Sequence, residues 1–153
     1  MDNKASAHLC IAQTEDLDAL VAMVRALNAE DGHPVEGDLH APLSTLLAEP
    51  ALGCVFLIEV AGKTIGYAIL CHGFSVEYGG RDCFLDEIYI APGHRTAGHG
   101  REALRQLEAW ARDEGICAMH LEVMPGNPAA RLYERTGFRD RNSRFMSKRL
   151  AQT

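Results

Sequence analysis

Hydrophobic residues recur at the spacing of one helical face along residues 17–27, and a second, shorter helix fits residues 41–48. Two apolar runs, residues 53–60 and 64–74, flank a tight turn and predict an antiparallel hairpin. The apolar run at residues 83–91 predicts the next strand after a polar loop. The first half of the chain therefore predicts two helices followed by an antiparallel meander.

The second half of the chain alternates helices and strands. A helix ends near Glu114, where a glycine follows it, and the next strand fits residues 116–124. A short helix begins near Pro128, and a last strand fits residues 144–151. With a short strand at residues 9–13, this order predicts a mixed α/β sheet.

Composition narrows the class of protein. The 153 residues are 47% hydrophobic, which predicts one globular domain over residues 1–153 with a substantial core. The formal net charge of -6 argues against nonspecific nucleic-acid binding. No apolar run approaches the ~18 residues of a membrane helix, and no signal-peptide stretch is visible, so we expect a soluble cytoplasmic protein. The cysteines and histidines lack metal-ligand spacing, and no metal site is assigned.

The stretch HRTAGHGREAL, beginning at His94, places two glycines at the expected start of a helix. Free backbone N–H groups point outward there, and glycine lets the backbone approach a pyrophosphate closely. Arg95 and Arg101 would add charge-assisted hydrogen bonds. The stretch therefore indicates a phosphate site.

Two other glycine motifs offer alternative interpretations. AGKT, at residues 61–64, ends like a P-loop, but Leu57 stands where that motif needs glycine, so we interpret it as a hairpin turn. Gly98-x-Gly100-x-x-Ala103 fits a dinucleotide-binding fingerprint, yet it follows an antiparallel hairpin and lies seven residues beyond its strand. A small NAD(P)-binding protein stays the lesser alternative.

A third interpretation includes the arginine, because Arg95-x-x-Gly98-x-Gly100 matches the pattern R/Q-x-x-G-x-G/A. From FLDEIYIAPGHRTAGHGREAL through LEVMPGNPAARLYERTGF, the chain resembles the GNAT superfamily of acyl-CoA-dependent N-acyltransferases. The resemblance implies a single-domain GNAT fold, with an antiparallel N-terminal meander, splayed parallel strands and about four flanking helices. It also implies an N-acetyltransferase that uses acetyl-CoA by direct transfer. A noncatalytic acyl-CoA-binding module on the same fold is the alternative.

The resemblance also implies which residues bind acetyl-CoA. The backbone of Ile88, Tyr89 and Ile90 would bind the pantetheine arm and polarise the thioester carbonyl. Asn127 matches the asparagine that contacts the pantetheine, although a helix N-cap is a strong competing role. The remaining positions assigned to coenzyme A are Arg95, Thr96, Ala97, Gly98, His99, Gly100, Arg101 and Ala130.

Three residues are candidates for the chemistry. Tyr133 matches the tyrosine that many relatives use as general acid toward the departing sulfur, and its alternative is a core tyrosine. Asp86 and Glu87 lie in LDEIYI, which resembles the strand of diamine and polyamine acetyltransferases. Either acid would bind the ammonium or relay its proton. Strand alternation predicts that they point to opposite faces, and an edge-strand charge pair is the alternative.

The acceptor is expected to be a small cationic amine, such as a polyamine, an amino acid derivative or an aminoglycoside-like compound. Glu77 and Asp82 join the two strand acids in a chain of net negative charge, which attracts cations. Glu30, Asp31 and His33 lie in a loop that contacts the acceptor in relatives, but a solvated helix end is the more ordinary interpretation. A homodimer is the one protein partner that the resemblance suggests.

Overall fold

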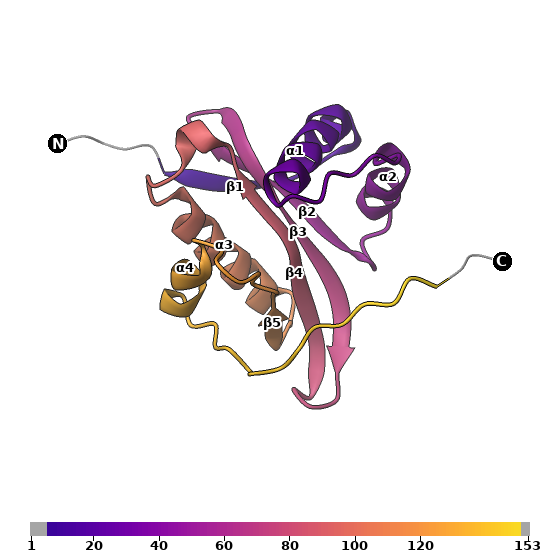
Figure 1. Cartoon of the computed structure of the whole chain (residues 1–153), viewed down its shortest axis with the longest axis vertical. Helices are drawn as coiled ribbons and strands as arrows, with labels where there is room; N and C mark the ends of the chain where they lie inside the picture. The colour runs from indigo at the N-terminus through magenta and orange to yellow at the C-terminus, as the bar shows by residue number, and fades with distance from the viewer. Residues whose placement is uncertain (1–5, 151–153) are drawn as a thin grey trace. The chain divides into compact units, whose positions relative to one another are not determined.

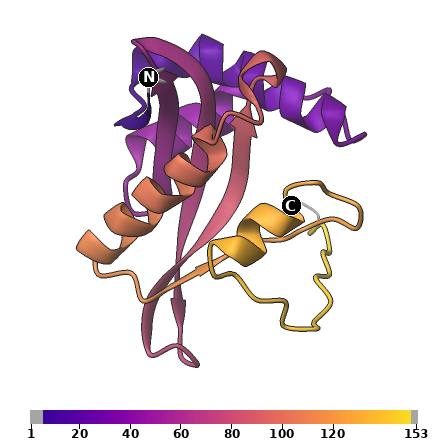
Figure 2. The same ribbon diagram turned by 90° about the vertical axis from the view of Figure 1, so that its left-hand side faces the viewer.

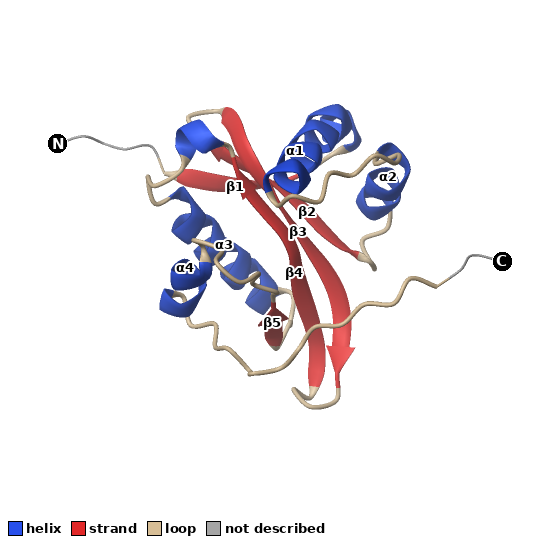
Figure 3. Cartoon of the chain, viewed as in Figure 1, coloured by secondary structure: helices blue, strands red, loops and turns tan. Residues whose placement is uncertain are grey.

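The apolar runs of the sequence form one mixed five-stranded sheet in a computed structural model that describes residues 6–150 (Figures 1 and 3). The first four strands pair antiparallel in chain order, and the fifth pairs parallel to the fourth. The strands are β1 (Ala7–Ile11), β2 (Gly53–Val60), β3 (Lys63–Ser75), β4 (Gly80–Ile90) and β5 (Ala118–His120). The predicted fold class, an α/β chain with an antiparallel meander, is confirmed.

Helices cover both faces of this sheet. α1 (Leu17–Glu30) and α2 (His40–Ala48) pack on one face, where Leu20 and Leu43 meet Tyr67 in a continuous core. α3 (His99–Asp113) lies along the other face, and its Trp110 ring meets Phe56 edge-on at 5.0 Å (Figure 2). None of the helices among residues 6–150 has the length and apolarity needed to cross a bilayer.

The chain forms two compact units, Met1–Leu121 and Glu122–Thr153. The first contains the sheet and α1 to α3, and the second contains α4 (Ala130–Arg135). Residues 139–150 hold no helix or strand, so the predicted last strand is wrong over residues 144–150, and Ala151 lies outside the described residues. Phe145 and Met146 are exposed, so no apolar burial selects a strand register for this stretch.

The parallel pair β4–β5 is short. It joins three residue pairs, from Asp82 with Ala118 to Phe84 with His120, although the sequence predicts a strand over residues 116–124. β4 continues six residues beyond Phe84. Within residues 6–121 no strand pairs with this continuation on the β5 side, so the last part of β4 has a free edge there. This arrangement agrees with the predicted splay of the parallel strands.

Candidate active site

The pairing of β3 with β4 shifts register at the two acidic residues. Ile69 lies opposite Glu87 and Leu70 lies opposite Leu85, which leaves Asp86 as an extra residue in β4. Such a β-bulge interrupts the alternation of side chains along a strand. Both carboxylates consequently line one cavity. The prediction that they point to opposite faces is therefore wrong, because the bulge was not visible in the sequence.

The cavity has a volume of about 220 Å³ and lies between the α1–α2 pair and strands β3 and β4. Its two charged residues are Asp86 and Glu87. The apolar residues that line it are Val24, Leu39, Pro42, Leu43, Leu46 and Ile69. A cavity with acidic groups among hydrocarbon walls is suited to an ammonium group, since a charge needs a partner wherever water is displaced.

Glu87 is held by hydrogen bonds from two neighbouring elements. The Tyr67 hydroxyl donates to Glu87 Oε2 at 2.8 Å, and the Asn28 side chain also donates to the carboxylate. Tyr67 is completely buried, and this burial raises the pKa of its hydroxyl far above the ordinary value, so it remains a donor. These two bonds fix the orientation of Glu87 toward the cavity.

Both acids of the cavity have raised pKa values. Burial raises the pKa of Glu87 and outweighs the opposing effect of the Tyr67 hydrogen bond, while the charge of Asp86 raises it further. Partial loss of solvation raises the pKa of Asp86, although this residue stays exposed. A carboxylate with a raised pKa accepts a proton more readily near neutral pH, so either group is suited to general base catalysis.

The loop between β4 and α3 contains two residues in the left-handed region of backbone conformation. Thr96 has φ 62° and Gly98 has φ 88°, and a Cβ added at Gly98 would meet no atom within 4 Å. The first intrahelical bond of α3 runs from Glu102 N–H to the Gly98 carbonyl at 3.1 Å. The N–H groups of His99, Gly100 and Arg101 therefore have no acceptor within the helix. This geometry fits a pyrophosphate group.

Arg95 binds protein groups on three sides. Its Nε donates to the Ile90 carbonyl at 2.6 Å, and its Nη2 donates to Glu30 Oε2 at 2.7 Å. Its guanidinium carbon also lies 5.5 Å from the centre of the Tyr89 ring. In this structure Arg95 joins the loop to the end of β4 and to the end of α1. Glu30, a candidate for acceptor binding, is thereby paired with the arginine of the β4–α3 loop.

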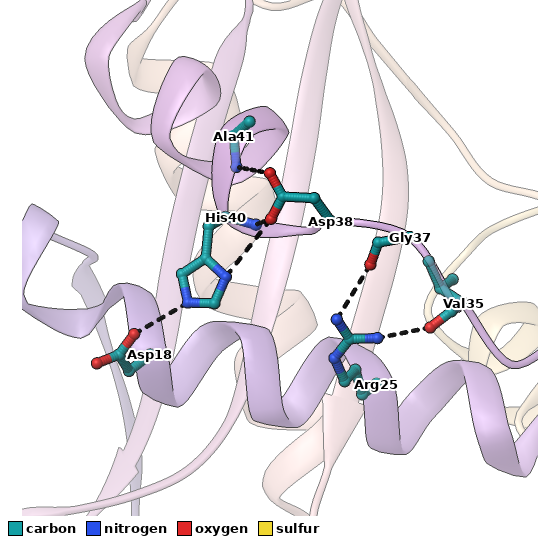
Figure 4. A network of polar contacts seen from close by, with 7 residues as sticks. All are labelled: Asp18, Arg25, Val35, Gly37, Asp38, His40 and Ala41. Atoms are coloured by element: carbon teal, nitrogen blue, oxygen red, sulfur yellow. Dashed lines mark hydrogen bonds and ion pairs between the residues drawn. The ribbon is translucent and has the colours of Figure 1, made fainter.

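The connection between α1 and α2 is held by a polar network (Figure 4). The Arg25 guanidinium donates to the carbonyls of Val35 at 2.6 Å and Gly37 at 3.0 Å. The His40 ring, at the start of α2, lies 3.1 Å from the Asp18 carboxylate of α1. Because α2 supplies the outer wall of the cavity, these contacts hold that wall against α1. Asp31 and His33 do not line the cavity.

The second unit contains the other predicted site residues. The Asn127 side-chain oxygen accepts the Ala129 N–H at 2.8 Å, and its backbone carbonyl accepts the Ala130 N–H at 3.1 Å. Asn127 therefore stabilises the turn that leads into α4, whereas the N-cap position of that helix is Ala129. Tyr133 is buried in α4, with its ring edge-on to Phe138 at 6.0 Å. The ring of Tyr133 is thus part of the packing of this unit.

Sequence reasoning missed three contributors to these sites. It did not single out Tyr67 and Asn28, which hold Glu87, or the pairing of Glu30 with Arg95. No local pattern marks them, because each contact joins residues from different elements. Only the register of β3 against β4, once known, would have placed Tyr67 near the two acids.

Comparison with known proteins identifies the family. The model of the acetyltransferase (GNAT) family matches residues 21–138, which is more than half of the chain. The chain belongs to this family, and it is an acetyltransferase with acetyl-CoA as its co-substrate. The match favours the acetyltransferase interpretation over that of a NAD(P)-binding protein.

Individual relatives agree with the family. The chain is 26% identical over 132 residues to thialysine N-epsilon-acetyltransferase of Bos taurus, covering 85% of this chain and 73% of that protein. An integron cassette protein from the mobile metagenome of Cole Harbour Salt Marsh superposes with a TM-score of 0.82 at 29% identity, covering 95% and 91% of the two chains. A predicted acetyltransferase from Clostridium acetobutylicum, solved with acetyl-CoA, shares the fold at a TM-score of 0.77 and 18% identity, with 93% and 96% coverage.

Proposed function

We propose that this enzyme transfers the acetyl group of acetyl-CoA directly to the primary amine of a small cationic molecule. The observation that carries the proposal is the β4 bulge, which places the carboxylates of Asp86 and Glu87 in one cavity. The cavity borders β4, the strand that leads into the loop proposed to bind the pyrophosphate. An amine bound there would therefore lie beside a strand whose free edge can hold the pantetheine arm.

Coenzyme A binding is proposed to depend mainly on backbone groups. The free edge of Ile88, Tyr89 and Ile90 would hydrogen-bond the pantetheine, and an N–H of this stretch would polarise the thioester carbonyl. The residues from Thr96 to Arg101 would bind the pyrophosphate at the start of α3. Asn127 and Ala130 would contact the pantetheine from the second unit.

The transfer requires three proton movements. An ammonium bound beside Asp86 loses one proton to Glu87, and the free amine attacks the thioester carbon, so that a C–N bond forms and the C–S bond breaks. The nitrogen loses its second proton to solvent as the neutral amide forms. Tyr133 gives its proton to the departing coenzyme A thiolate and regains one from solvent. Glu87 is the proposed base because Tyr67 and Asn28 fix it, which leaves Asp86 to hold the ammonium.

The setting of the enzyme belongs to the same proposal. The family match spans residues 21–138 and thus includes parts of both compact units, which supports a single catalytic domain over residues 1–153. We expect it to act in the cytoplasm as a homodimer. Phe74 and Val76, exposed at the β3–β4 hairpin, offer an apolar surface for a second copy. Sedimentation at several concentrations tests the dimer.

The test of the proposed reaction is thiol release from acetyl-CoA in the presence of primary amines. Asp86→Asn and Glu87→Gln should each lower kcat/KM, with the larger loss, on the order of 10²-fold, at Glu87. Glu36→Gln, on the exposed α1–α2 connection, is the matched control and should behave as wild type. Coenzyme A binding without turnover of any amine would favour the noncatalytic binding module instead.

A further inference from the structure

The residues that line the acceptor cavity are either apolar or acidic. Six of the eight residues that line it carry only hydrocarbon side chains, contributed by α1, the α1–α2 connection, α2 and β3. The two exceptions are the neighbouring acids Asp86 and Glu87 of β4. Charge is therefore concentrated at one end of the cavity, beside the strand where the thioester would lie.

This asymmetry distinguishes between classes of amine. One ammonium can be bound by the two carboxylates. A second ammonium further along the same molecule would face Val24, Leu43 and Ile69, which offer no hydrogen-bond acceptor in their side chains. A cation that loses water against these walls without gaining a partner costs far more free energy than a methyl group placed there. The walls thus select against a polycation and favour a hydrocarbon tail.

The cavity is also small and well supported. Its volume of about 220 Å³ is below the roughly 300–1,000 Å³ of pockets that enclose drug-sized ligands. Val24, Leu43 and Ile69 are buried members of one core cluster, so these side chains cannot easily move apart to enlarge the cavity. A short tail fills the space, and a long or branched one does not.

We propose that the acceptor is a primary amine with a single positive charge carried on a short hydrocarbon tail. This inference rests on the proposed function and makes it narrower. The ammonium lies against Asp86 and Glu87, and the tail lies between α2 and β3. The substrate class is then a simple alkylamine, as opposed to a polyamine or an aminoglycoside-like compound.

The first experiment compares matched amines on the wild-type protein with saturating acetyl-CoA. From propylamine to hexylamine, kcat/KM should rise by about fourfold for each added methylene, and it should level off or fall at octylamine. 1,6-Diaminohexane, which differs from hexylamine by a terminal ammonium, should be at least tenfold poorer. A diamine that equals or exceeds hexylamine would overturn the inference.

The second experiment changes the wall. Leu46→Glu places a carboxylate in the cavity and should reverse the preference, so that 1,6-diaminohexane becomes the better acceptor. Leu47→Glu is the matched control, because Leu47 is the next residue of α2, has similar burial and packs on the same core without lining the cavity. It should leave the preference unchanged. If Leu46→Glu does not fold, Leu46→Ala replaces it and should move the best chain length upward.

The outcomes separate the two levels of the argument. Acetylation of diamines or polyamines in preference to alkylamines would contradict the proposed substrate class and leave the proposed amine transfer intact. Absence of thiol release with every amine, in a protein that binds coenzyme A in calorimetry, sinks both. Equal responses of the Leu46 and Leu47 variants would show that the cavity wall does not select the acceptor.

Discussion

The loop proposed to bind the cofactor and the cavity proposed to bind the acceptor would recognise their ligands in different ways. The loop before α3 presents backbone N–H groups, and its shape depends on the left-handed conformations of Thr96 and Gly98. The cavity presents side chains from four elements, and its charge depends on a bulge in β4. Backbone recognition leaves a short motif in the sequence, whereas a cavity assembled from distant side chains leaves none. The predictions below test this contrast, beginning with the largest effect.

Gly100→Val should disable the cofactor side alone. Valine is at least as favourable as glycine within a helix, so α3 should still form, while the added side chain keeps a pyrophosphate from the N–H groups. We expect coenzyme A affinity to fall about 100-fold or more, the value of one or two hydrogen bonds to a charged group. Gly93→Val is the control, since a Cβ at Gly93 meets nothing within 4 Å. Unchanged affinity in a folded Gly100→Val protein would contradict the placement.

Tyr133→Phe should lower the rate of acetyl transfer without weakening the binding of either ligand. If Tyr133 protonates the thiolate, kcat should fall on the order of 10²-fold, while coenzyme A affinity stays nearly unchanged. The phenylalanine keeps the ring that packs against Phe138. A variant with wild-type kcat would show that the Tyr133 hydroxyl does not protonate the thiolate.

Arg95→Ala and Glu30→Gln should rank the contacts of the loop. Arg95→Ala removes the bond to the Ile90 carbonyl together with the packing on Tyr89, and we expect about a tenfold loss of coenzyme A affinity. Glu30→Gln removes only an exposed ion pair, which is worth at most about 1 kcal/mol, so the loss should be fivefold or less. Calorimetry with coenzyme A measures both. The reverse order would mean that the end of α1 controls the loop.

Tyr67→Phe should act on the acceptor side through Glu87. The lost hydrogen bond stabilised the carboxylate, so the pKa of Glu87 should rise further. Because the base must be ionised, the acidic limb of the kcat/KM profile should move to higher pH, while coenzyme A affinity stays constant. Tyr89→Phe is not a suitable control, since Arg95 lies over that ring. An unmoved acidic limb would show that Glu87 is not the titrating base.

The smallest predicted effect is a change in the thermal stability of the Glu87→Gln variant. A carboxyl whose pKa is raised by folding costs stability when it is ionised, and that cost disappears as the pH falls through the raised pKa. The variant should therefore melt higher than wild type at pH 8, by about 1–4 °C, and the difference should vanish toward pH 4. Glu36→Gln should show no such trend. A difference that grows on acidification would reverse the sign of the argument.

The sequence by itself determined the features that depend on neighbours along the chain. Residues 53–75 alternate and turn as a hairpin because the turn and the apolar runs are local, and α3 ends where Gly115 takes φ 72°. The loop motif also belongs to this group, because its ligand groups are the backbone of consecutive residues. The prediction of a last strand was wrong because a strand also depends on a distant partner. The pattern of RFMSKRL does not specify such a partner strand.

Only the tertiary structure decided the acceptor side. The bulge at Asp86 arises from the register of β3 against β4. Because of this register, the two acids line a single cavity, although alternation predicts that they point to opposite faces. The Arg95–Glu30 pair joins residues 65 positions apart, and Tyr67 reaches Glu87 across 20 positions. Periodicity reports which face of one element is buried, but it carries no information on which side chains of another element meet it. Contacts between elements are fixed by packing and register, so the residues proposed to select the acceptor come together only when the sheet and its helices are assembled.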